Sequence, residues 1–571
     1  MFTPPPLETE DFVLHELFDY QATHQAEHPY CAWLDDSSSS DQAVEMTNLE
    51  FNRASHRAAA LLSRDALDGE KVGLFALAHP VHYLAVFMGL LRLGVVPLVI
   101  TPFCNPAVVG RMLDNVGCRR VLTTPNLRSG DGGLRYVEDV IRALAPGQEV
   151  EFMDIPALEE LFPKLGCETA RDEFTPFPKL EARQNQNLDD VAFYMYTSGT
   201  TGTPKAVPHT QRFMRSRCVL SSLKTDGTPL LRDCFIGFSP WHSAGTLYYL
   251  LQPPLAGLVP FVTPPREFSH TNSPYSTSSE NVRGMLEYAV RGGCERVSTF
   301  PACIQVWARD ERSVELMRGL KYGVGFAGAP LATALGTQLV NKGVRLNAGY
   351  GTTEIGFVIM GPGDLGRSEE EWMYLEFPRV LELRVVEVPG TGFVEIHLLA
   401  SPTRAYEWAV YNTEDGKGYQ TGDLFEAHPN RERMYRFVGR KDDTIIHSDT
   451  AKTTPGPIED TIQSHEFVKG VIAFGEGRNK VGILVECVNA VEPYTAEMIE
   501  RCKDMIWPTV KEANRITTFY SRIARDMILF TKSDLPLPRT PKGGIQRKAA
   551  LSLYRDDIDR LYDGTLPSVK L

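Results

Sequence analysis

The sequence predicts an α/β fold in which mainly parallel sheets are flanked by helices. The first observation is an alternation of short apolar runs with helical segments between residues 71 and 124. The second is a capping-box pattern, Thr47-Asn48-Leu49-Glu50, that opens a helix continuing to residue 62. The third is composition: 571 residues that are 43% apolar and 23% charged can bury an ample core.

The alternation can be followed residue by residue. Strands are expected at KVGLFAL (71–77), VVPLVIT (95–101) and RRVLTT (119–124), with helices at 80–93 and 107–115 between them. Another helix is expected at 12–24, and a strand at VEIHLLA (394–400) continues the pattern. Because strand–helix–strand units place successive strands parallel, we expect helices on both faces of the sheet.

Charge and cysteine usage narrow the function classes. The net charge of −13 argues against nucleic acid or an anionic membrane as the main partner. The ten cysteines show no CxxC pair and no metal-type spacing, as expected for reduced thiols in a cytoplasmic protein. The most apolar run, 83–100, is interrupted by Arg92, Gly94 and Pro97, which favours a buried helix, turn and strand over a membrane span.

A loop rich in small hydroxyl residues and glycines is the main functional signal. An apolar run at 191–196 leads into TSGTTGTPK (197–205), and small residues of this kind let backbone N–H groups approach phosphate oxygens. A helix is expected from His209 onward. In isolation such a patch would be a surface loop, but its strand–loop–helix context favours phosphate binding. It is not the GxxxxGK[ST] loop, because Ala206 follows Lys205. The predicted phosphate-binding residues are Thr197, Ser198, Gly199, Thr200, Thr201, Gly202 and Lys205.

This loop resembles the signature of the adenylate-forming superfamily, which includes acyl-CoA ligases, peptide-synthetase adenylation domains and luciferases. Further matching segments follow in the same order, so the resemblance covers nearly the whole chain: GFAGAPL (325–331), NAGYGTTE (347–354), YQTGD (419–423), GRKD (439–442) and LPRTPKGGIQRK (537–548). The resemblance implies a reaction in which a carboxylic acid and ATP, with Mg²⁺, give an acyl adenylate and pyrophosphate.

The resemblance also implies roles for residues around the nucleotide. Tyr350 would stack on adenine, Asp423 would bind the ribose hydroxyls, and Glu354 would help to hold Mg²⁺. Taken singly, Gly-Ala-Pro and Thr-Gly-Asp are common turns, so the prediction depends on their order. The other residues implied to surround ATP are Gly328, Ala329 and Pro330 along the adenine, Gly351, Thr352 and Thr353 at the α-phosphate, and Arg440 near ribose and phosphate.

The resemblance divides the chain into a large domain, 1–441, and a small mobile α+β domain, 442–571. Asp442 matches the hinge residue about which the small domain rotates between half-reactions. The superfamily's catalytic lysine would fall at Gly544, and Lys542 lies two residues earlier. We predict Lys542 as the catalytic cation, against the alternative of a solvated basic loop. The form KGGIQRK resembles the adenylation domains of fungal peptide-synthetase-like carboxylic acid reductases.

The segment FSPWHSAG (238–245) bears on the acid. Amino-acid-activating relatives place an aspartate after the aromatic or His position, whereas here Ser243 follows His242. An unpaired buried ammonium is costly, so α-amino acids should be poor substrates. The predicted pocket suits an aryl acid or, through cation–π contact, a quaternary ammonium acid. His242 either gates the pocket and joins Lys542, Glu354 and Thr353 as a catalytic candidate, or is an ordinary buried histidine. The predicted pocket residues are Trp241, Ser243, Phe300, Phe326, Gly349 and Phe357.

The fate of the acyl group is implied only by resemblance. It would pass to a phosphopantetheine thiol on a carrier domain, with a reductase domain downstream; neither is visible in the sequence, which predicts a module of a longer protein. A free-standing ligase that uses CoA is one alternative. A catalytically impaired nucleotide-binding module is another, because Gly544 and Thr450-Ala451 depart from the superfamily pattern.

Overall fold

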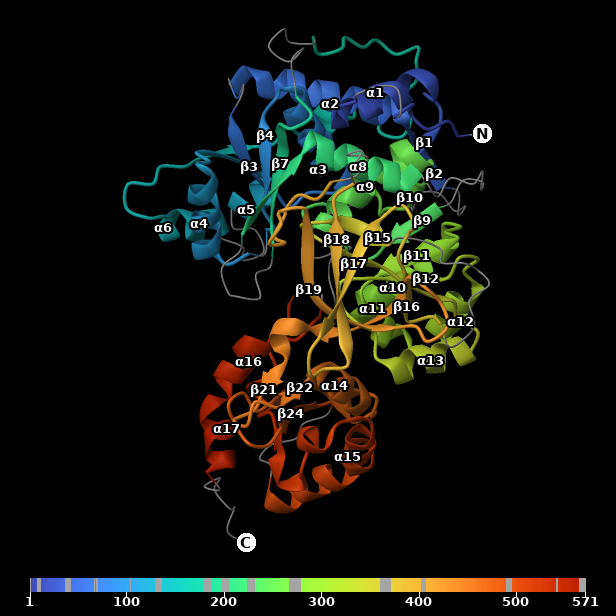
Figure 1. Ribbon diagram of the computed structural model, residues 1–571. Helices are drawn as coiled ribbons and strands as arrows, with labels where there is room; N and C mark the ends of the chain where they lie inside the picture. Colours follow the sequence, from blue (N-terminus) through green and yellow to red (C-terminus); the bar gives the residue numbers. More distant parts are fainter. Residues whose placement is uncertain are drawn as a thin grey trace.

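In the residues that it describes, the computed structural model has two large, mainly parallel sheets, a five-stranded antiparallel sheet, small two-stranded antiparallel sheets and a C-terminal α+β segment (Figure 1). The residues that the structure describes are 2–7, 12–35, 43–65, 67, 70–102, 104–128, 136–178, 187–197, 205–222, 232–265, 279–359, 371–401, 407–488, 495–540 and 543–563.

The first sheet has the strand order β6-β5-β3-β4-β7-β8, in which only β8 is antiparallel to its neighbour. The predicted strands and helices of residues 71–124 are confirmed within a few residues. The strands are β3 Lys71–Phe75, β4 Val96–Val99, β5 Arg120–Thr123, β6 Glu151–Asp154, β7 Val191–Tyr196 and β8 Ala206–Thr210. The helices are α3 Pro80–Arg92, α4 Pro106–Val116, α5 Pro125–Arg128, α6 Tyr136–Ala143 and α7 Leu158–Leu161.

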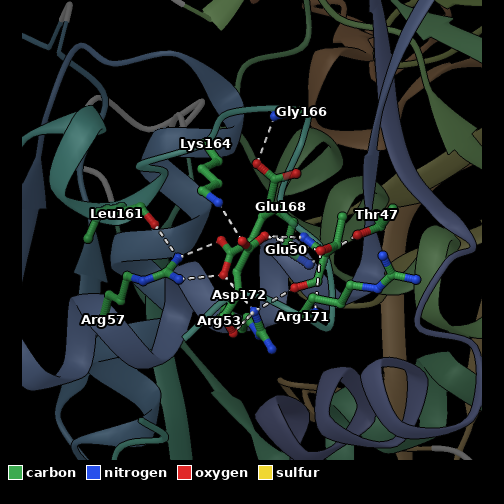
Figure 2. Close-up of polar contacts among 11 residues, drawn as sticks. Thr47, Glu50, Arg53, Arg57, Leu161, Lys164, Gly166, Glu168, Arg171 and Asp172 are labelled. Carbon is green, nitrogen blue, oxygen red and sulfur yellow. Dashed lines mark hydrogen bonds and ion pairs between the residues drawn. The ribbon is translucent and has the colours of Figure 1, made fainter. Parts of the chain in front are cut away.

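The N-terminal segment packs on the first sheet. It contains α1 Leu14–His24, β1 Pro29–Leu34, β2 Ala43–Thr47 and α2 Asn48–Leu62. Only half of the predicted capping box forms: the Thr47 hydroxyl accepts a hydrogen bond from the Glu50 N–H, but the Glu50 carboxylate instead accepts one from the Gly166 N–H at 2.7 Å (Figure 2). Glu168, which is buried, pairs with Arg53 at 2.9 Å and Arg57 at 2.5 Å. This network fastens the loop after α7 to α2.

The second sheet is parallel, with the order β10-β9-β11-β12-β13. Its strands are β9 Arg232–Phe235, β10 Val259–Pro260, β11 Arg296–Thr299, β12 Val324–Phe326 and β13 Leu346–Ala348. The helices of this region are α8 Gln211–Ser222, α9 Ser243–Ala256, α10 Ser279–Arg291, α11 Pro301–Trp307, α12 Glu311–Gly319 and α13 Thr333–Asn341. The short hairpin of β14 Tyr350–Thr352 and β15 Gly356–Ile359 follows it.

The third sheet is antiparallel, so the parallel pattern does not continue to residue 400 as expected. The predicted strand at 394–400 is β18, and it pairs antiparallel with both β17 and β19. Its link to β17 is only four residues long, which allows a hairpin but not the crossover that parallel pairing needs. The strands are β16 Tyr374–Glu376, β17 Glu382–Val388, β18 Phe393–Leu399, β19 Gly418–Ala427 and β20 Met434–Arg440.

The C-terminal segment forms a separate lobe with its own apolar core (Figure 1). It touches the larger lobe where Asp460 accepts a hydrogen bond from the Thr333 N–H at 2.8 Å. Its strands are β21 Ile445–Ile446, β22 Lys452–Thr453, β23 Val468–Phe474, β24 Gly482–Cys487 and β25 Ile528–Phe530. Its helices are α14 Pro455–Gln463, α15 Ala496–Ile516, α16 Arg547–Leu553 and α17 Arg555–Tyr562.

The apolar run at 83–100 forms α3, a turn and β4, as the sequence predicted. Most of its side chains are buried in the core of the first sheet. Across the described parts of the chain, no helix combines the length and apolarity needed to cross a bilayer.

Candidate active site

Three of the predicted nucleotide-binding residues meet although they are far apart in sequence. Asp423 Oδ2 accepts a hydrogen bond from the Tyr350 hydroxyl at 2.6 Å, and Oδ1 accepts one from Arg440 Nη1 at 2.9 Å. Asp423 and Arg440 face each other on the antiparallel strands β19 and β20, and Tyr350 begins β14. The Tyr350 ring packs at a steep angle against Phe425, which holds it in place.

The electrostatics of this cluster centre on Asp423. It is 4% exposed, and this burial raises its pKa to about 6 even though Arg440 and Tyr350 favour the ionised form. An ionised carboxylate offers about four acceptor positions, so each oxygen can accept a further hydrogen bond. Gly422 has φ +67°, and a Cβ atom there would lie 3.0 Å from Arg440 Nη2. Glycine is therefore favoured both by this left-handed backbone conformation within β19 and by the approach of Arg440.

The hinge candidate Asp442 lies in a short 3₁₀ turn, Lys441–Asp443, immediately after this cluster. Its carboxylate accepts a hydrogen bond from Arg440 Nε at 3.2 Å. The neighbouring Lys441 pairs with the buried Glu395 at 2.7 Å, and Glu395 also accepts the Gly422 N–H at 3.0 Å. These contacts connect the end of β20 to the part of β19 that carries Asp423.

A buried histidine connects β8, which follows the predicted phosphate loop, to the segment that carries Thr353. His209 lies in β8, not in the helix expected there, and its Nε2 donates to the Thr353 carbonyl oxygen at 2.8 Å. Burial lowers the pKa of His209 to about 4, so the ring is neutral near pH 7. It also stacks on Phe213, with ring centroids 4.7 Å apart. The Thr353 hydroxyl lies 3.5 Å from that of Ser243 at the start of α9.

The phosphate loop is described only at its ends. The Thr197 N–H donates to the Lys205 carbonyl oxygen at 3.2 Å, which closes the base of the loop, and Lys205 is exposed. The predicted Ser198, Gly199, Thr200, Thr201 and Gly202 lie outside the described residues.

The predicted catalytic Lys542 lies outside the described residues together with Pro541, and the nearest described residues are Thr540 and Gly543. The Gly543 N–H donates to the Thr540 carbonyl oxygen at 2.9 Å, and Gly543 has φ +85°. A Cβ atom on Gly543 would come within 2.7 Å of Ala302 Cβ in the first turn of α11. The basic loop therefore reaches the large lobe next to Phe300, which precedes α11.

An aromatic pocket opens at the carboxyl edge of the second sheet. Phe326, Gly349 and Phe357 of the predicted set line it. Phe235, Phe238 and Ile359 complete its apolar wall, and Arg296 and Ser298 lie among its lining residues. The pocket adjoins the Asp423 cluster, because Gly349 lines the pocket and Tyr350 is the next residue.

The other three predicted pocket residues are placed elsewhere. Trp241 is buried in the core of the first sheet, edge-on to Tyr83 with ring centroids 5.9 Å apart. Phe300 lies behind Phe238, at 3.8 Å between centroids, and so supports the wall from outside the lining. Ser243 lies near Thr353, as described above. Trp241 lies before α9 and Phe300 caps α11, so their neighbours in the fold, rather than the local motif, decide which way their side chains face. The role of all six residues in binding the acid stays a prediction.

His242 occupies the N-cap of α9, where its Nδ1 accepts the Ala244 N–H at 3.2 Å. Its ring is perpendicular to that of Phe300, with centroids 6.0 Å apart. These contacts suit a helix cap, and the gating role remains a prediction.

The remaining nucleotide candidates lie around the same edge. Gly328, Ala329 and Pro330 form the turn after β12, and Gly351 pairs with Phe357 across the β14–β15 hairpin. Thr352 ends β14, and Glu354 follows in the turn, where its carbonyl oxygen accepts the Ala409 N–H at 2.9 Å. In the described part of the chain, no group of three or more His, Cys, Asp or Glu side chains could hold a metal ion. A single carboxylate such as Glu354 fits Mg²⁺ only when phosphate oxygens supply further ligands.

Sequence reasoning missed several residues of the site. His209 was assigned to a helix, and Phe235, Phe238, Arg296 and Ser298 were not considered. A signal was present for part of this set: Asp233 and Arg296 are charged residues directly before the short apolar or small runs 234–236 and 297–299. Charges in buried parallel strands are rare unless they are paired.

The fold and this cluster define an adenylate-forming enzyme with two lobes. The family of AMP-binding enzymes matches residues 18–390, and the AMP-binding enzyme C-terminal domain matches residues 442–565. The chain therefore belongs to the AMP-binding enzyme family, within the superfamily of enzymes that activate carboxylic acids as adenylates.

Among curated proteins, the chain is 33% identical over 574 residues to adenylate-forming reductase Nps11 of Serpula lacrymans var. lacrymans. It is 34% identical over 568 residues to adenylate-forming reductase Nps9 of the same organism. These alignments cover 98% and 97% of this chain but 50% of each relative, so the chain spans about half the length of the curated relatives it matches.

Solved structures share the fold. The anthranilate CoA ligase AuaEII in complex with anthranoyl-AMP superposes with a TM-score of 0.69 at 18% identity, covering 95% of this chain and 97% of that one. O-succinylbenzoate coenzyme A synthetase (MenE) from Bacillus subtilis in complex with AMP gives 0.66 at 18% identity, covering 93% and 97%.

Proposed function

We propose that this chain activates an aryl or other non-α-amino carboxylic acid with ATP, and that the acyl group then passes to a phosphopantetheine thiol on a carrier domain of a longer cytoplasmic protein, where it is reduced. One observation carries the first half of the proposal: Tyr350, Asp423 and Arg440 converge beside an aromatic pocket. The similarity to adenylate-forming reductases supports the second half.

In this proposal the protein groups bind and orient ATP and the acid. Asp423 accepts hydrogen bonds from the ribose hydroxyls, and its ionised form is the better acceptor. Lys205 and the loop before it bind the outer phosphates, and Thr352 and Thr353 face the α-phosphate. Glu354 and phosphate oxygens hold Mg²⁺, which neutralises phosphate charge when it is bound.

The acid's carboxylate oxygen attacks the α-phosphorus, and pyrophosphate leaves with the bonding electron pair. Lys542 supplies positive charge to both reacting groups, and the close approach of Gly543 to the first turn of α11 supports this role, because Phe300 just before that helix packs against the pocket residue Phe238. The division at residues 441 and 442, with Asp442 as the hinge, belongs to the same proposal.

Pyrophosphate exchange with a panel of carboxylic acids tests this function. Exchange should require an acid, should occur with one or more aryl acids, and should be weak with α-amino acids because none of the described residues that line the pocket is Asp or Glu. Exchange without any acid, or no exchange with every acid tested, would overturn the proposal. A product that forms only with free CoA would favour the free-standing ligase.

A further inference from the structure

A buried pair of opposite charges lies at the bottom of the aromatic pocket. Arg296 and Asp233 face each other on the adjacent strands β11 and β9, at 5% and 0% exposure. Asp233 Oδ2 accepts hydrogen bonds from Arg296 Nε at 2.9 Å and Nη2 at 2.5 Å, and from the Ser298 hydroxyl at 3.1 Å. Arg296 and Ser298 line the pocket and Asp233 does not, so the carboxylate is occupied beneath them.

This arrangement leaves hydrogen-bonding capacity facing the pocket. Within the described residues, Arg296 Nη1 makes no hydrogen bond, and the Ser298 oxygen keeps lone pairs that can accept one. Gly325 pairs with Ser298 across the sheet, and a Cβ atom there would lie 3.1 Å from the Ser298 oxygen. Glycine at this position therefore keeps the hydroxyl uncovered. We call Arg296 and Ser298, with Asp233 beneath them, the polar floor.

Arg296 marks the end of the polar floor that lies far from the nucleotide side of the pocket; Ser298 lies nearer to that side, and its hydroxyl bonds the same Asp233 oxygen as Arg296. In a parallel sheet the ligand site forms outside the carboxyl ends of the strands, which here is the side of Gly349 and Tyr350. Arg296 begins β11 and Thr299 ends it, and three residues of strand span about 10 Å. An acid whose carboxylate lies next to ATP would therefore direct its opposite end toward Arg296 and Ser298.

Charge balance limits what that end can be. The Arg296–Asp233 pair is neutral overall, so a second carboxylate would bury an extra negative charge, and an ammonium group would face the guanidinium. An uncharged oxygen meets neither obstacle, because it can accept from Arg296 Nη1 and exchange a hydrogen bond with Ser298.

We infer, on the premise that the proposed adenylation takes place in this pocket, that the acid carries an uncharged oxygen such as a phenolic hydroxyl at the end remote from its carboxylate, bound by Arg296 and Ser298. The aromatic wall supplied by Phe235, Phe238, Phe326 and Phe357 fits an aryl body for such an acid. This selects the hydroxyaryl class over the quaternary ammonium acids that the aromatic residues alone left open.

Matched acid pairs test the inference. Benzoate is compared with 3- and 4-hydroxybenzoate, and 3-phenylpropanoate with its 3- and 4-hydroxyphenyl analogues; terephthalate and glycine betaine represent charged ends. For each, pyrophosphate exchange gives kcat/KM, and calorimetry with a non-hydrolysable ATP analogue gives Kd. In one or more pairs the hydroxylated acid should be at least about tenfold better in both measurements, because unpaired polar groups in a site reject the analogue that lacks the oxygen.

Variants assign the preference to the polar floor. The measured quantity is the preference ratio, which is kcat/KM for the hydroxylated acid divided by kcat/KM for its unsubstituted partner. Ser298→Ala removes the hydroxyl and Gly325→Ala removes access to it, so each variant should reduce this ratio several-fold. The double variant Asp233→Leu/Arg296→Met replaces both charges and avoids an unpaired buried one, so it should fold and bring the ratio close to one. Ser55→Ala is the matched control: Ser55 is also buried and bonded to an arginine, Arg92, at 2.8 Å, but lies in α2, and its ratio should equal the wild-type ratio.

The outcomes separate this inference from the proposed function. Three results would overturn the inference alone. The first is exchange with no preference for the hydroxylated acid in any pair, and the second is a best substrate that lacks the remote oxygen. The third is a preference ratio that is unchanged in both Ser298→Ala and the double variant. Discrimination in Kd without any exchange would support the polar floor and overturn the adenylation proposal. Absence of both binding and exchange for every acid would overturn both.

Discussion

Replacing Asp423 by Asn should separate nucleotide binding from folding stability. Asp423 is buried and its pKa is raised by burial from its ordinary value of 3.8 to about 6. A raised carboxyl pKa stabilises the fold below pH 4, and this contribution is lost as the pH rises through about 6. At about 1.4 kcal/mol per pH unit, the ionised side chain costs about 3 kcal/mol at pH 7.

Asp423→Asn should affect nucleotide binding and folding stability in opposite directions. Asn removes the buried charge, so we expect the free energy of unfolding at pH 7 to be unchanged or higher, even though the bonds to Tyr350 and Arg440 weaken. Binding loses charge-assisted hydrogen bonds to the ribose, which together contribute about 2–3 kcal/mol. The Kd for nucleotide should therefore rise about 30- to 150-fold.

Adenosine is the appropriate ligand for the pH dependence, because it carries no phosphate that titrates between pH 5 and 8. Ribose hydroxyls favour the ionised carboxylate, so binding should release a proton near pH 6. At pH 5 about a tenth of Asp423 is ionised in the free protein, and the affinity of the wild type should be about tenfold weaker than at pH 7. Calorimetry at pH 5, 6, 7 and 8 measures this, with thermal unfolding recorded in parallel.

Asp423→Asn should show a flat pH profile. Asp310→Asn provides the control: Asp310 caps α12 by accepting the Ser313 N–H at 3.0 Å, and this variant should retain the wild-type profile. An equally steep profile in Asp423→Asn, or an unchanged Kd at pH 7, would refute the assignment of Asp423 to the ribose.

Three further predictions follow from the same geometry. Lys542→Ala should lower the adenylation rate by orders of magnitude with adenosine affinity within about twofold, and near-normal turnover in pyrophosphate exchange would exclude this lysine as the catalytic cation. Gly543→Val introduces a β-branched side chain at φ +85° and a Cβ 2.7 Å from Ala302 Cβ, so adenylation should fall at least about tenfold while adenosine still binds; an unaltered rate would show that the loop does not dock at α11. His209→Phe keeps the stacking on Phe213 but removes the donor to the Thr353 carbonyl, so kcat should fall about tenfold or more with a smaller change in KM for ATP, and an equal loss in both would contradict a positioning role for His209.

Secondary structure was predicted best from the sequence where burial on a sheet determines both the local hydrophobic pattern and the fold. Residues 71–124 alternate between apolar strands and amphipathic helices, and burial on a parallel sheet requires this pattern. The antiparallel sheet was missed because a strand such as 393–399 looks alike in either pairing, and the direction depends on the length of its connections. His209 was placed in a helix because the strand β8 is short and polar at its end.

The structure brings three of the predicted nucleotide-binding residues together, whereas only three of the six predicted acid-pocket residues line the pocket, and the binding roles of both sets stay predictions. Tyr350, Asp423 and Arg440 belong to segments with distinctive spacing, and the structure brings them within hydrogen-bonding distance. Trp241 and Phe300 are aromatic, like several residues that line the pocket. Which aromatic side chain faces the cavity depends on helix rotation and strand register. Those are set by packing across the whole lobe, and a short motif does not contain them.

The Arg440–Asp423 and Arg296–Asp233 pairs differ in which charge faces the proposed ligand. In the first, Arg440 binds one oxygen of Asp423 and Tyr350 the other, so the carboxylate still has acceptor positions for hydroxyl groups. In the second, Asp233 is occupied by Arg296 and Ser298, and it is the guanidinium that reaches the pocket. A carboxylate presented to the ligand accepts from ribose, while a guanidinium presented to the ligand donates to an oxygen. An arginine and an aspartate on adjacent strands can thus serve opposite recognition tasks. In each pair the second residue orients the one that faces the ligand and compensates its charge.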